Sequence, residues 1–258
     1  MSTKAPSSSK MGELSFDQIS MRERERALLL GGTGSGKTTL ETLLLSDFYT
    51  RYKTARILIL DSKPRYRADF LVTGISAKRR YRHWTPVSKG GDPALPGSVV
   101  IDSPNDLDLA WRQSRIVIAQ CDHAAERWRL VECAEKFYNS ARHTRPQLLC
   151  VDETADFFHI NGSPIAGSTD ALVRIARSGR ERGTAALYCS QRARSLPSSI
   201  IEEMSQLYLF VLDGVADLKR CYEMGAPTEL QPPPREHEFY LWTKRERRKV
   251  FGPFTIDL

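Results

Sequence analysis

Long apolar runs are absent from this sequence. The longest, residues 207–212, is far below the roughly 20 residues that a membrane-spanning helix needs. The N-terminal residues, MSTKAPSSSK, contain no apolar core of a signal peptide. We therefore expect no integral membrane segment and a cytoplasmic location. We also expect residues 1–14 to form a disordered tail and residues 15–258 a single domain, since a chain of 258 residues suffices for one full core.

Closely spaced cysteines are missing as well. The five cysteines lie far apart with no C-x-x-C pair, and the five histidines are scattered. This spacing argues against a disulfide framework and against a zinc site of the usual sequence pattern. Cys150 and Cys189 fall within apolar runs, which indicates buried, reduced thiols of the kind found in a cytoplasmic protein.

The chain has no internal repeat; instead, short apolar runs alternate with stretches of helical period. This alternation predicts an α/β fold of three layers, with a mostly parallel central sheet and helices on both faces. Helices are expected after Gly36 and over 124–141 and 169–182. Strands are expected at 27–30, 56–60, 98–101, 115–119, 148–151, 185–189, 207–212, 238–243 and 250–254.

Residues 31–38, GGTGSGKT, match the P-loop pattern G-x-x-x-x-G-K-[ST] between an apolar strand and an amphipathic helix. Glycines let backbone N–H groups curl around a phosphate, and the helix N-terminus adds a favourable dipole. Lys37 can neutralise phosphate oxygens and Thr38 can bind Mg²⁺. The motif predicts an ATP·Mg²⁺ site formed by Gly31, Gly32, Thr33, Gly34, Ser35, Gly36, Lys37, Thr38 and Thr39.

A second motif is an apolar run, 148–151, that ends in Asp152 and Glu153. Ligand sites of open α/β sheets lie at the carboxyl ends of strands. We therefore expect Asp152 to bind the Mg²⁺ shell and Glu153 to polarise the attacking water as the catalytic carboxylate. Gln191 ends another apolar run, where it either senses the γ-phosphate or simply belongs to a turn.

The positive charge is concentrated in one stretch. The chain has a net charge of +7, and residues 63–90 contain eight Lys or Arg against the single acid Asp69. Such a stretch predicts either a polyanion-binding surface or a solvated loop. The candidate DNA contacts are Lys78, Arg79, Arg80 and Arg82, which lie next to Tyr81 and Trp84.

The sequence LVRIARSGRERG at 172–183, followed by a buried strand and Ser-Gln191-Arg192, resembles the FtsK/HerA family of DNA-translocating ATPases. Further matches are the P-loop, Asp152-Glu153, the Asp61-Ser-Lys63 motif and residues 224–226. The resemblance spans about 27–243 and implies a RecA/ASCE-like P-loop fold. Ala193 and Ser62 stand where many members have proline, which affects loop rigidity and not chemistry.

This resemblance implies a homo-oligomeric ring, expected to be a hexamer, with ATP at each subunit interface and double-stranded DNA in the channel. It also implies that Arg180, or Arg182 in its place, reaches the nucleotide of a neighbouring subunit as an arginine finger. A motor without a recognisable anchor or DNA-reading domain is most similar to the genome-packaging ATPases of membrane-containing double-jelly-roll viruses. Its further partners would then be proteins of the capsid vertex or the viral membrane.

Other functions remain open at this point. Within the same class, the chain could be a plasmid or conjugative DNA-transfer ATPase, or the assembly ATPase of a filamentous phage. Outside this class, a P-loop also occurs in small-molecule kinases and in non-hydrolysing nucleotide switches. Glu153 beside Asp152 argues against both, because neither needs a carboxylate to activate water.

Overall fold

The computed structural model describes residues 19–63, 71–72, 79–80, 98–121, 123–142, 144–159, 170–212, 214–244 and 249–256. The expected tail, 1–14, lies outside these residues, as do Lys78 and Arg82. Arg79 and Arg80 form a short strand, but their side chains are outside the description.

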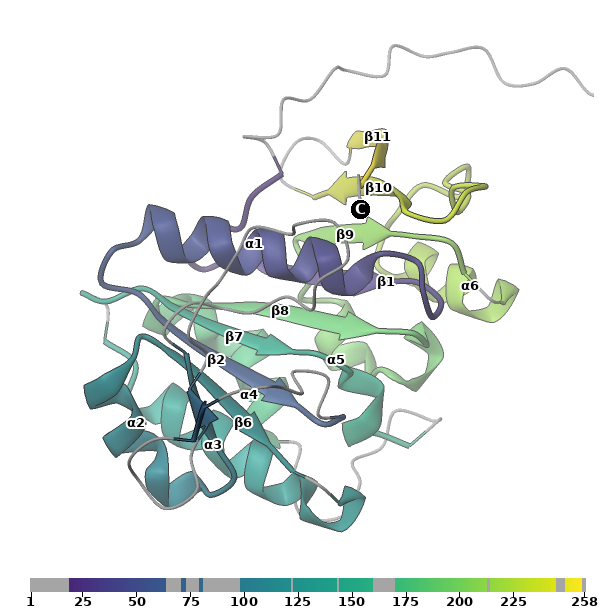
Figure 1. Cartoon of the computed structure of the whole chain (residues 1–258). Helices are drawn as coiled ribbons and strands as arrows, with labels where there is room; N and C mark the ends of the chain where they lie inside the picture. Colours follow the sequence, from purple (N-terminus) through teal and green to yellow (C-terminus); the bar gives the residue numbers. More distant parts are fainter. Residues whose placement is uncertain are drawn as a thin grey trace, which may run out of the picture.

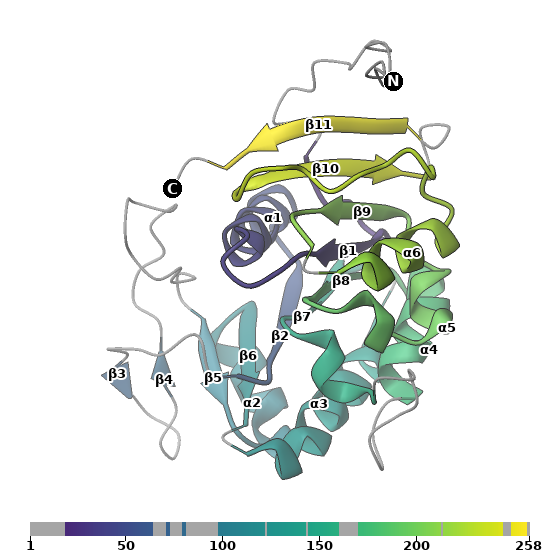
Figure 2. The same cartoon turned by 90° about the vertical axis from the view of Figure 1, so that its right-hand side faces the viewer.

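One mixed sheet of eleven strands forms the centre of the molecule, in the order β11-β10-β9-β1-β8-β7-β2-β6-β5-β4-β3 (Figures 1 and 2). The seven strands from β9 to β5 pair in parallel, and the pairs at both ends are antiparallel. The strands are β1 (Arg26–Leu30), β2 (Arg56–Asp61), β3 (Leu71–Val72), β4 (Arg79–Arg80), β5 (Val99–Ile101), β6 (Ile116–Gln120), β7 (Gln147–Val151), β8 (Thr184–Ser190), β9 (Gln206–Leu209), β10 (Glu238–Thr243) and β11 (Lys249–Thr255).

Helices cover both faces of this sheet, as the alternation of runs predicts. The helices of the described residues are α1 (Lys37–Arg51), α2 (Leu107–Gln113), α3 (Arg127–Asn139), α4 (Asp170–Ser178), α5 (Ser198–Ile201) and α6 (Val215–Glu223), and the same residues form five short 3₁₀ turns. Helix α1 lies on one face, and α2 to α6 lie on the other (Figure 2). The three-layer α/β prediction is confirmed.

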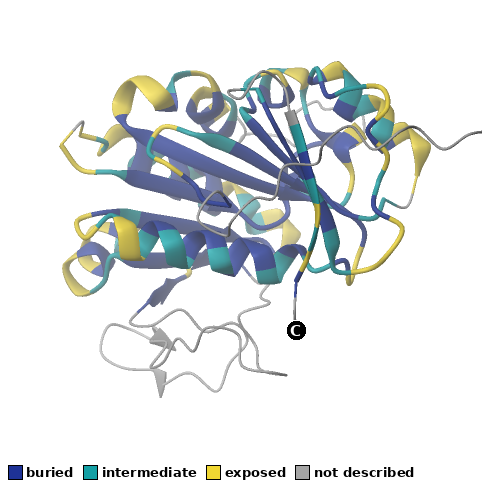
Figure 3. Cartoon of the chain, turned by 90° about the horizontal axis from the view of Figure 1, so that it is seen from above, coloured by how far each residue is buried: buried dark blue, intermediate teal, exposed yellow. Residues whose placement is uncertain are grey.

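Two hydrophobic cores, one on each face, explain why the strands are apolar along their whole length. Alternate residues of β1 illustrate this: Leu28 and Leu30 belong to the core under α2 to α6, and Ala27 and Leu29 to the core under α1. All four side chains are fully buried, and Figure 3 shows the same burial along the central strands. Strands covered on both faces have no polar side, so they lack the alternation of a half-exposed strand.

The sequence pattern did not predict three of the helices, α2, α5 and α6, or two of the strands, β3 and β4. Helix α2 has only seven residues and α5 only four, which is too short for a helical period to be recognised. The turn before α2 is instead set by a cap, since Ser103 Oγ accepts a hydrogen bond from the Asn105 N–H at 3.3 Å. Within the described part of the chain, no helix is long and apolar enough to cross a membrane.

Candidate nucleotide-binding and hydrolysis site

The strand order brings three polar segments to one edge of the sheet. Strands β1, β8 and β7 are neighbours and run parallel, with Leu30 opposite Ser190 and Val151 opposite Tyr188. Their carboxyl ends therefore lie side by side at what we call the carboxyl edge. The P-loop follows β1, Gln191 follows β8, and Asp152 with Glu153 follows β7. Residues more than 150 positions apart in the sequence thus meet in one place.

The P-loop is shaped by two glycines. Gly36 has a φ of 97°, a left-handed conformation that a side chain would strain, and α1 begins at the next residue. A Cβ on Gly31 would lie 2.5 Å from Cβ of Phe210, so only glycine fits against the strand end there. Lys37 is buried and donates to the carbonyl oxygens of Gly31 and Gly32, both at 2.6 Å. The loop thus encloses the lysine ammonium at the N-terminus of a 15-residue helix.

A cavity of about 330 Å³ lies over this loop, and its wall is formed by Thr33, Gly34, Ser35, Gly36, Lys37, Thr38, Thr39, Gln191 and His237. Thr33 Oγ1 donates to Gln191 Oε1 at 3.2 Å. The structure therefore places the Gln191 side chain against the P-loop and not in an isolated turn. Ser35 Oγ is buried and has no hydrogen-bond partner among the described residues, so a polar group in the loop is left for a ligand to satisfy.

Glu153 is only 2% exposed and is held by β8. Its Oε1 accepts one hydrogen bond from Ser190 Oγ and one from the backbone N–H of Gln191, both at 3.2 Å. Burial raises the pKa of Glu153, while the Gln191 N–H and the charge of Lys63 oppose the rise. Oε2 is buried and has no hydrogen-bond partner in the described structure. A carboxylate with one oxygen anchored and the other unsatisfied suits the activation of a water molecule.

Asp152 and Thr38 are the residues that could hold a metal ion. Asp152 is 1% exposed, and Thr38 is half-buried in the first turn of α1. A carboxylate and a hydroxyl are hard oxygen ligands, which Mg²⁺ prefers, and Mg²⁺ commonly binds one or two carboxylates together with substrate phosphates. The donor set and the unsatisfied Ser35 Oγ beside it fit Mg²⁺ bound with a nucleotide.

The Asp61-Ser-Lys63 motif adds an ion-pair network beside this site. Asp156 lies on the turn after Glu153, and its Oδ2 accepts a hydrogen bond from Ser62 Oγ at 2.7 Å. The same oxygen forms ion pairs with Lys63 Nζ and Arg127 Nη2, each at 3.4 Å. Lys63 begins the basic stretch of the sequence, but here it neutralises Asp156 and lowers the pKa of Glu153. Lys63 therefore belongs to the immediate environment of Glu153.

Arg180 lies far from this edge. It is exposed in the 3₁₀ turn Gly179–Arg182, which leads into the start of β8. It lines a cavity of about 540 Å³ together with Arg24, Arg26 and Lys244 and with residues just before β9. The length of β8, about 20 Å, separates Arg180 from its own P-loop. Arg180 is therefore too far away to contact a nucleotide bound at its own P-loop.

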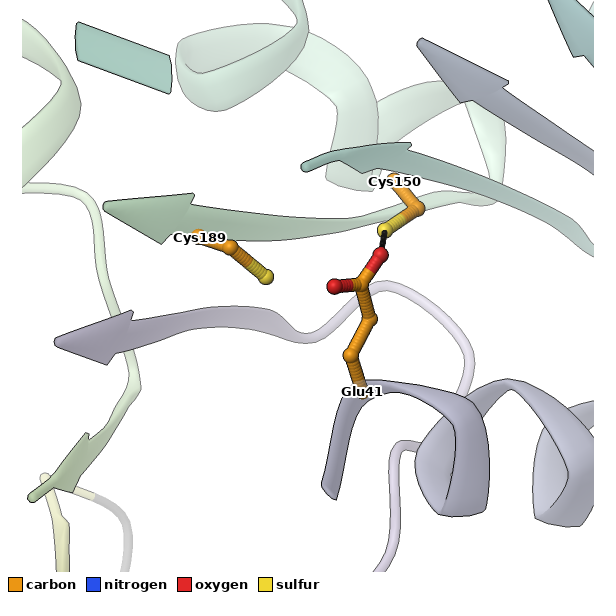
Figure 4. Close-up of side chains that lie close together, drawn as sticks. All are labelled: Glu41, Cys150 and Cys189. Atoms are coloured by element: carbon orange, nitrogen blue, oxygen red, sulfur yellow. Dashed lines mark hydrogen bonds between the residues drawn. The ribbon is translucent and has the colours of Figure 1, made fainter. Parts of the chain in front are cut away.

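Beneath the P-loop, the fully buried Glu41 of α1 points toward Cys150 of β7 and Cys189 of β8 (Figure 4). Their ligand atoms lie within 4.8 Å of one another, and Cys150 Sγ donates to Glu41 Oε1 at 3.0 Å. Burial raises the pKa of Cys150 well above its usual value and that of Cys189 to about 12. At neutral pH both thiols stay protonated, and the protonated Cys150 can donate the hydrogen bond to Glu41.

Two residues of the site are missed by sequence patterns. Ser190 anchors Glu153, and its only signal is that it is a polar residue ending an apolar strand. His237 precedes β10 with a φ of 62°, and its buried Nδ1 lies 3.2 Å from where a Cβ on Gly36 would be. No motif surrounds His237 in the sequence, so only the tertiary structure reveals that it lines the nucleotide cavity.

Comparison with known proteins finds no matching family model and no matching curated protein. Solved structures do match. The genome packaging NTPase B204 of Sulfolobus turreted icosahedral virus 2, in complex with ATP-gammaS, aligns with a TM-score of 0.58 and 14% identity over 90% of this chain and 98% of its own. B204, the DNA-packaging ATPase from Sulfolobus turreted icosahedral virus, aligns with a TM-score of 0.58 and 13% identity over 92% of this chain and 100% of its own.

EssC (ATPases 2 and 3) from Geobacillus thermodenitrificans aligns with a TM-score of 0.53 and 11% identity, over 90% of this chain and 40% of that longer one. At such identities the likeness concerns the fold. The chain therefore has the fold shared by these packaging and EssC ATPases, and the resemblance expected from its motifs is confirmed as a likeness of fold.

Proposed function

We propose that this protein is an ATPase that hydrolyses ATP at the carboxyl edge. The observation that supports this most directly is Glu153, anchored through one oxygen beside the P-loop, with its second oxygen buried and unsatisfied. In this proposal Lys37 neutralises phosphate oxygens, and Glu153 accepts a proton from the attacking water. Gln191, bonded to Thr33, orients the γ-phosphate or that water. Thr38 and Asp152 would hold Mg²⁺, which neutralises charge that develops on the phosphates.

We further propose that hydrolysis drives the translocation of double-stranded DNA, in the packaging of a viral genome. The fold likeness to a viral packaging NTPase over nearly the whole of both chains supports this function. The proposed assembly is a hexameric ring in which Arg180 stabilises the transition state of the neighbouring subunit. The motor would work in the host cytoplasm or at the virion's packaging vertex, against capsid or membrane proteins. Lys78, Arg79, Arg80 and Arg82 are candidate DNA contacts on sequence grounds alone.

A second candidate follows from another matching structure. The cytoplasmic domain of EccC from Thermomonospora curvata, described as a type VII secretion ATPase, aligns with a TM-score of 0.52 and 16% identity over 95% of this chain and 25% of its own. The same fold therefore occurs in motors of protein secretion. In that case the transported polymer would be a polypeptide and not DNA.

One experiment separates these functions. ATP hydrolysis by the full chain would be measured alone, with duplex DNA of mixed sequence, and with an unfolded polypeptide, and Glu153→Gln would serve as the inactive control. Stimulation by duplex DNA is the expected result for a DNA motor. Stimulation by the polypeptide alone would favour the secretion-type function, and the absence of hydrolysis under all conditions would refute the ATPase itself.

A further inference from the structure

The edge of the sheet opposite the nucleotide, where the parallel strands begin, is strongly basic over four neighbouring strands. We call it the amino edge. The segments that lead into β2, β6, β7 and β8 are residues 51–56, 112–115, 139–146 and 177–183. They contain ten Lys or Arg against one acid, Glu181; the basic residues are Arg51, Lys53, Arg56, Arg112, Arg115, Arg142, Arg145, Arg177, Arg180 and Arg182.

Because β8, β7, β2 and β6 are consecutive in the sheet, these four segments lie side by side. At 4.7–4.9 Å between strands, they span about 14 Å. The segments that lead into β1 and β9 differ, since there Arg24 and Arg26 alternate with Glu23 and Glu25, and Glu202 and Glu203 lie beside them. The excess of positive charge is therefore a property of one part of the amino edge.

A cavity of about 360 Å³ lies in the middle of this basic stretch, and we call it the basic cavity. It is lined by Arg56, Asn139, Ser140, Ala141, Arg142, Thr144, Arg145 and Gln147, none of which is acidic. Arg142 and Arg145 are exposed at its rim, in a turn closed by the Arg145 N–H bonded to the Arg142 carbonyl at 3.0 Å. Neither forms an ion pair with any residue that the structure describes.

Arg56 forms an inner wall of the cavity, with its guanidinium 5.1 Å from the centre of the Trp111 ring. Burial lowers the pKa of Arg56, and the positive charges of Arg145 and Arg142 lower it further, against an opposing effect of Asp108. Three guanidinium groups that repel one another around a cavity, with hydroxyl and amide groups between them, complement an oxyanion with several acceptor oxygens. A phosphate group has this chemistry.

We infer that the basic cavity binds a backbone phosphate of double-stranded DNA and that the basic residues beside it, apart from Arg180, follow the same strand. This inference rests on the proposed function. The extent of the charge favours DNA over a small anion, because the four segments present more cations than one phosphate can contact. Duplex DNA offers one phosphate per 3.4 Å of axis on each strand, which matches a basic stretch about 14 Å long. Contacts to the backbone alone are blind to sequence, as transport of a whole genome requires.

The test is the salt dependence of DNA binding by the full chain carrying Arg142→Ser and Arg145→Ser together. Each lost phosphate contact should reduce the slope of log affinity against log salt by about 0.9, so we expect a slope lower by about 1–2 and weaker binding at low salt. Arg142→Lys with Arg145→Lys keeps the charge and should retain most of the slope. Lys219→Ser with Arg129→Ser removes equal charge away from the cavity and serves as the matched control, and thermal unfolding checks that every variant folds.

The outcomes are distinguishable. If the natural sequence neither binds duplex DNA nor is stimulated by it, the proposed function fails. If it binds DNA but the Arg142/Arg145 serine variant keeps the same affinity and slope, or loses no more than the control variant, only the present inference is overturned. It is also overturned if the serine variant loses ATP hydrolysis in the absence of DNA while its DNA affinity is unchanged, because the cavity would then serve the nucleotide of a neighbouring subunit.

Discussion

Burial makes the folded protein hold a proton on Glu153 more tightly than the unfolded chain does, because it raises the pKa of this carboxyl group. The resulting stabilisation is complete below the pKa of the unfolded chain and is lost as the pH rises through the pKa of the folded protein. The ionised carboxylate therefore lowers the free energy of unfolding relative to the protonated form. Such a cost is common where function requires a charged group in a buried place.

Replacing Glu153 with Gln should greatly slow turnover and stabilise the protein. The amide oxygen can still accept from Ser190 Oγ and the Gln191 N–H, but it cannot accept a proton from water. We expect kcat to fall by about 10²–10⁴-fold, ATP binding to persist, and the melting temperature at pH 7 to rise above that of the natural sequence. Single-turnover kinetics, nucleotide binding and thermal unfolding provide the measurements.

Glu153→Ala is the comparison that separates charge from packing. It removes the charge together with both hydrogen-bond acceptors, so it should not show the stabilisation of Glu153→Gln. Turnover in Glu153→Gln close to that of the natural sequence would rule out Glu153 as the base.

Among the secondary structure elements, α1 connects the P-loop to the sheet through a polar contact inside an apolar core. Glu41 on α1 and Cys150 on β7 are both fully buried, and the Cys150 thiol donates to the Glu41 carboxyl at 3.0 Å. Because burial keeps this thiol protonated, the donor is present at neutral pH. The contact therefore helps to fix the helix that carries Lys37 and Thr38 against the strand that leads into Asp152.

Replacing Cys150 with Val should destabilise the protein by about 1–3 kcal/mol, because it removes a donor to a buried carboxyl and adds a methyl group to a filled core. Cys150→Ser restores a donor in the same place and serves as the matched control. Denaturant unfolding of the three proteins measures the difference. If Cys150→Val is as stable as Cys150→Ser, the thiol contributes packing only, and the hydrogen bond does not hold α1 in place.

For the whole molecule, the decisive feature is that the nucleotide site and Arg180 occupy opposite edges of one sheet. The P-loop cavity lies at the carboxyl edge, and Arg180 lines a cavity at the start of β1, β8 and β9. A head-to-tail arrangement that closes into a ring brings opposite surfaces of neighbouring subunits together. Such a ring is the assembly in which Arg180 can meet a nucleotide.

Mixing two inactive variants tests this arrangement. Arg180→Ala should bind ATP normally and hydrolyse it about 10³-fold or more slowly if the arginine acts as a finger. Lys37→Ala should bind no nucleotide. Mixed rings contain interfaces with an intact P-loop on one subunit and an intact Arg180 on the next, so part of the activity should return. Failure of every mixing ratio to restore hydrolysis, in rings shown to contain both variants, would place Arg180 outside the site.

The sequence alone was sufficient to predict nine of the eleven strands and to locate the P-loop and the Asp152-Glu153 pair at strand ends. These features are local: a strand covered on both faces is a run of apolar residues, and GGTGSGKT shapes its own loop through Gly36 and the start of α1. All nine expected strands were found, most with ends shifted by one or two residues. The short helix α2 was missed because its seven residues are too few to show a period.

Only the tertiary structure decided which polar strand ends meet. The pairing of β8 with both β1 and β7 brings Gln191 to Thr33 and Ser190 to Glu153, and contacts between residues so far apart leave no local pattern in the sequence. The position of the basic surface also depends on the tertiary structure. Along the sequence the densest positive stretch is 63–90, whereas the basic amino edge is assembled from four short segments that the parallel sheet aligns. Electrostatic potential depends on distance in space, so a surface built from separated segments becomes visible only when the strand order is known.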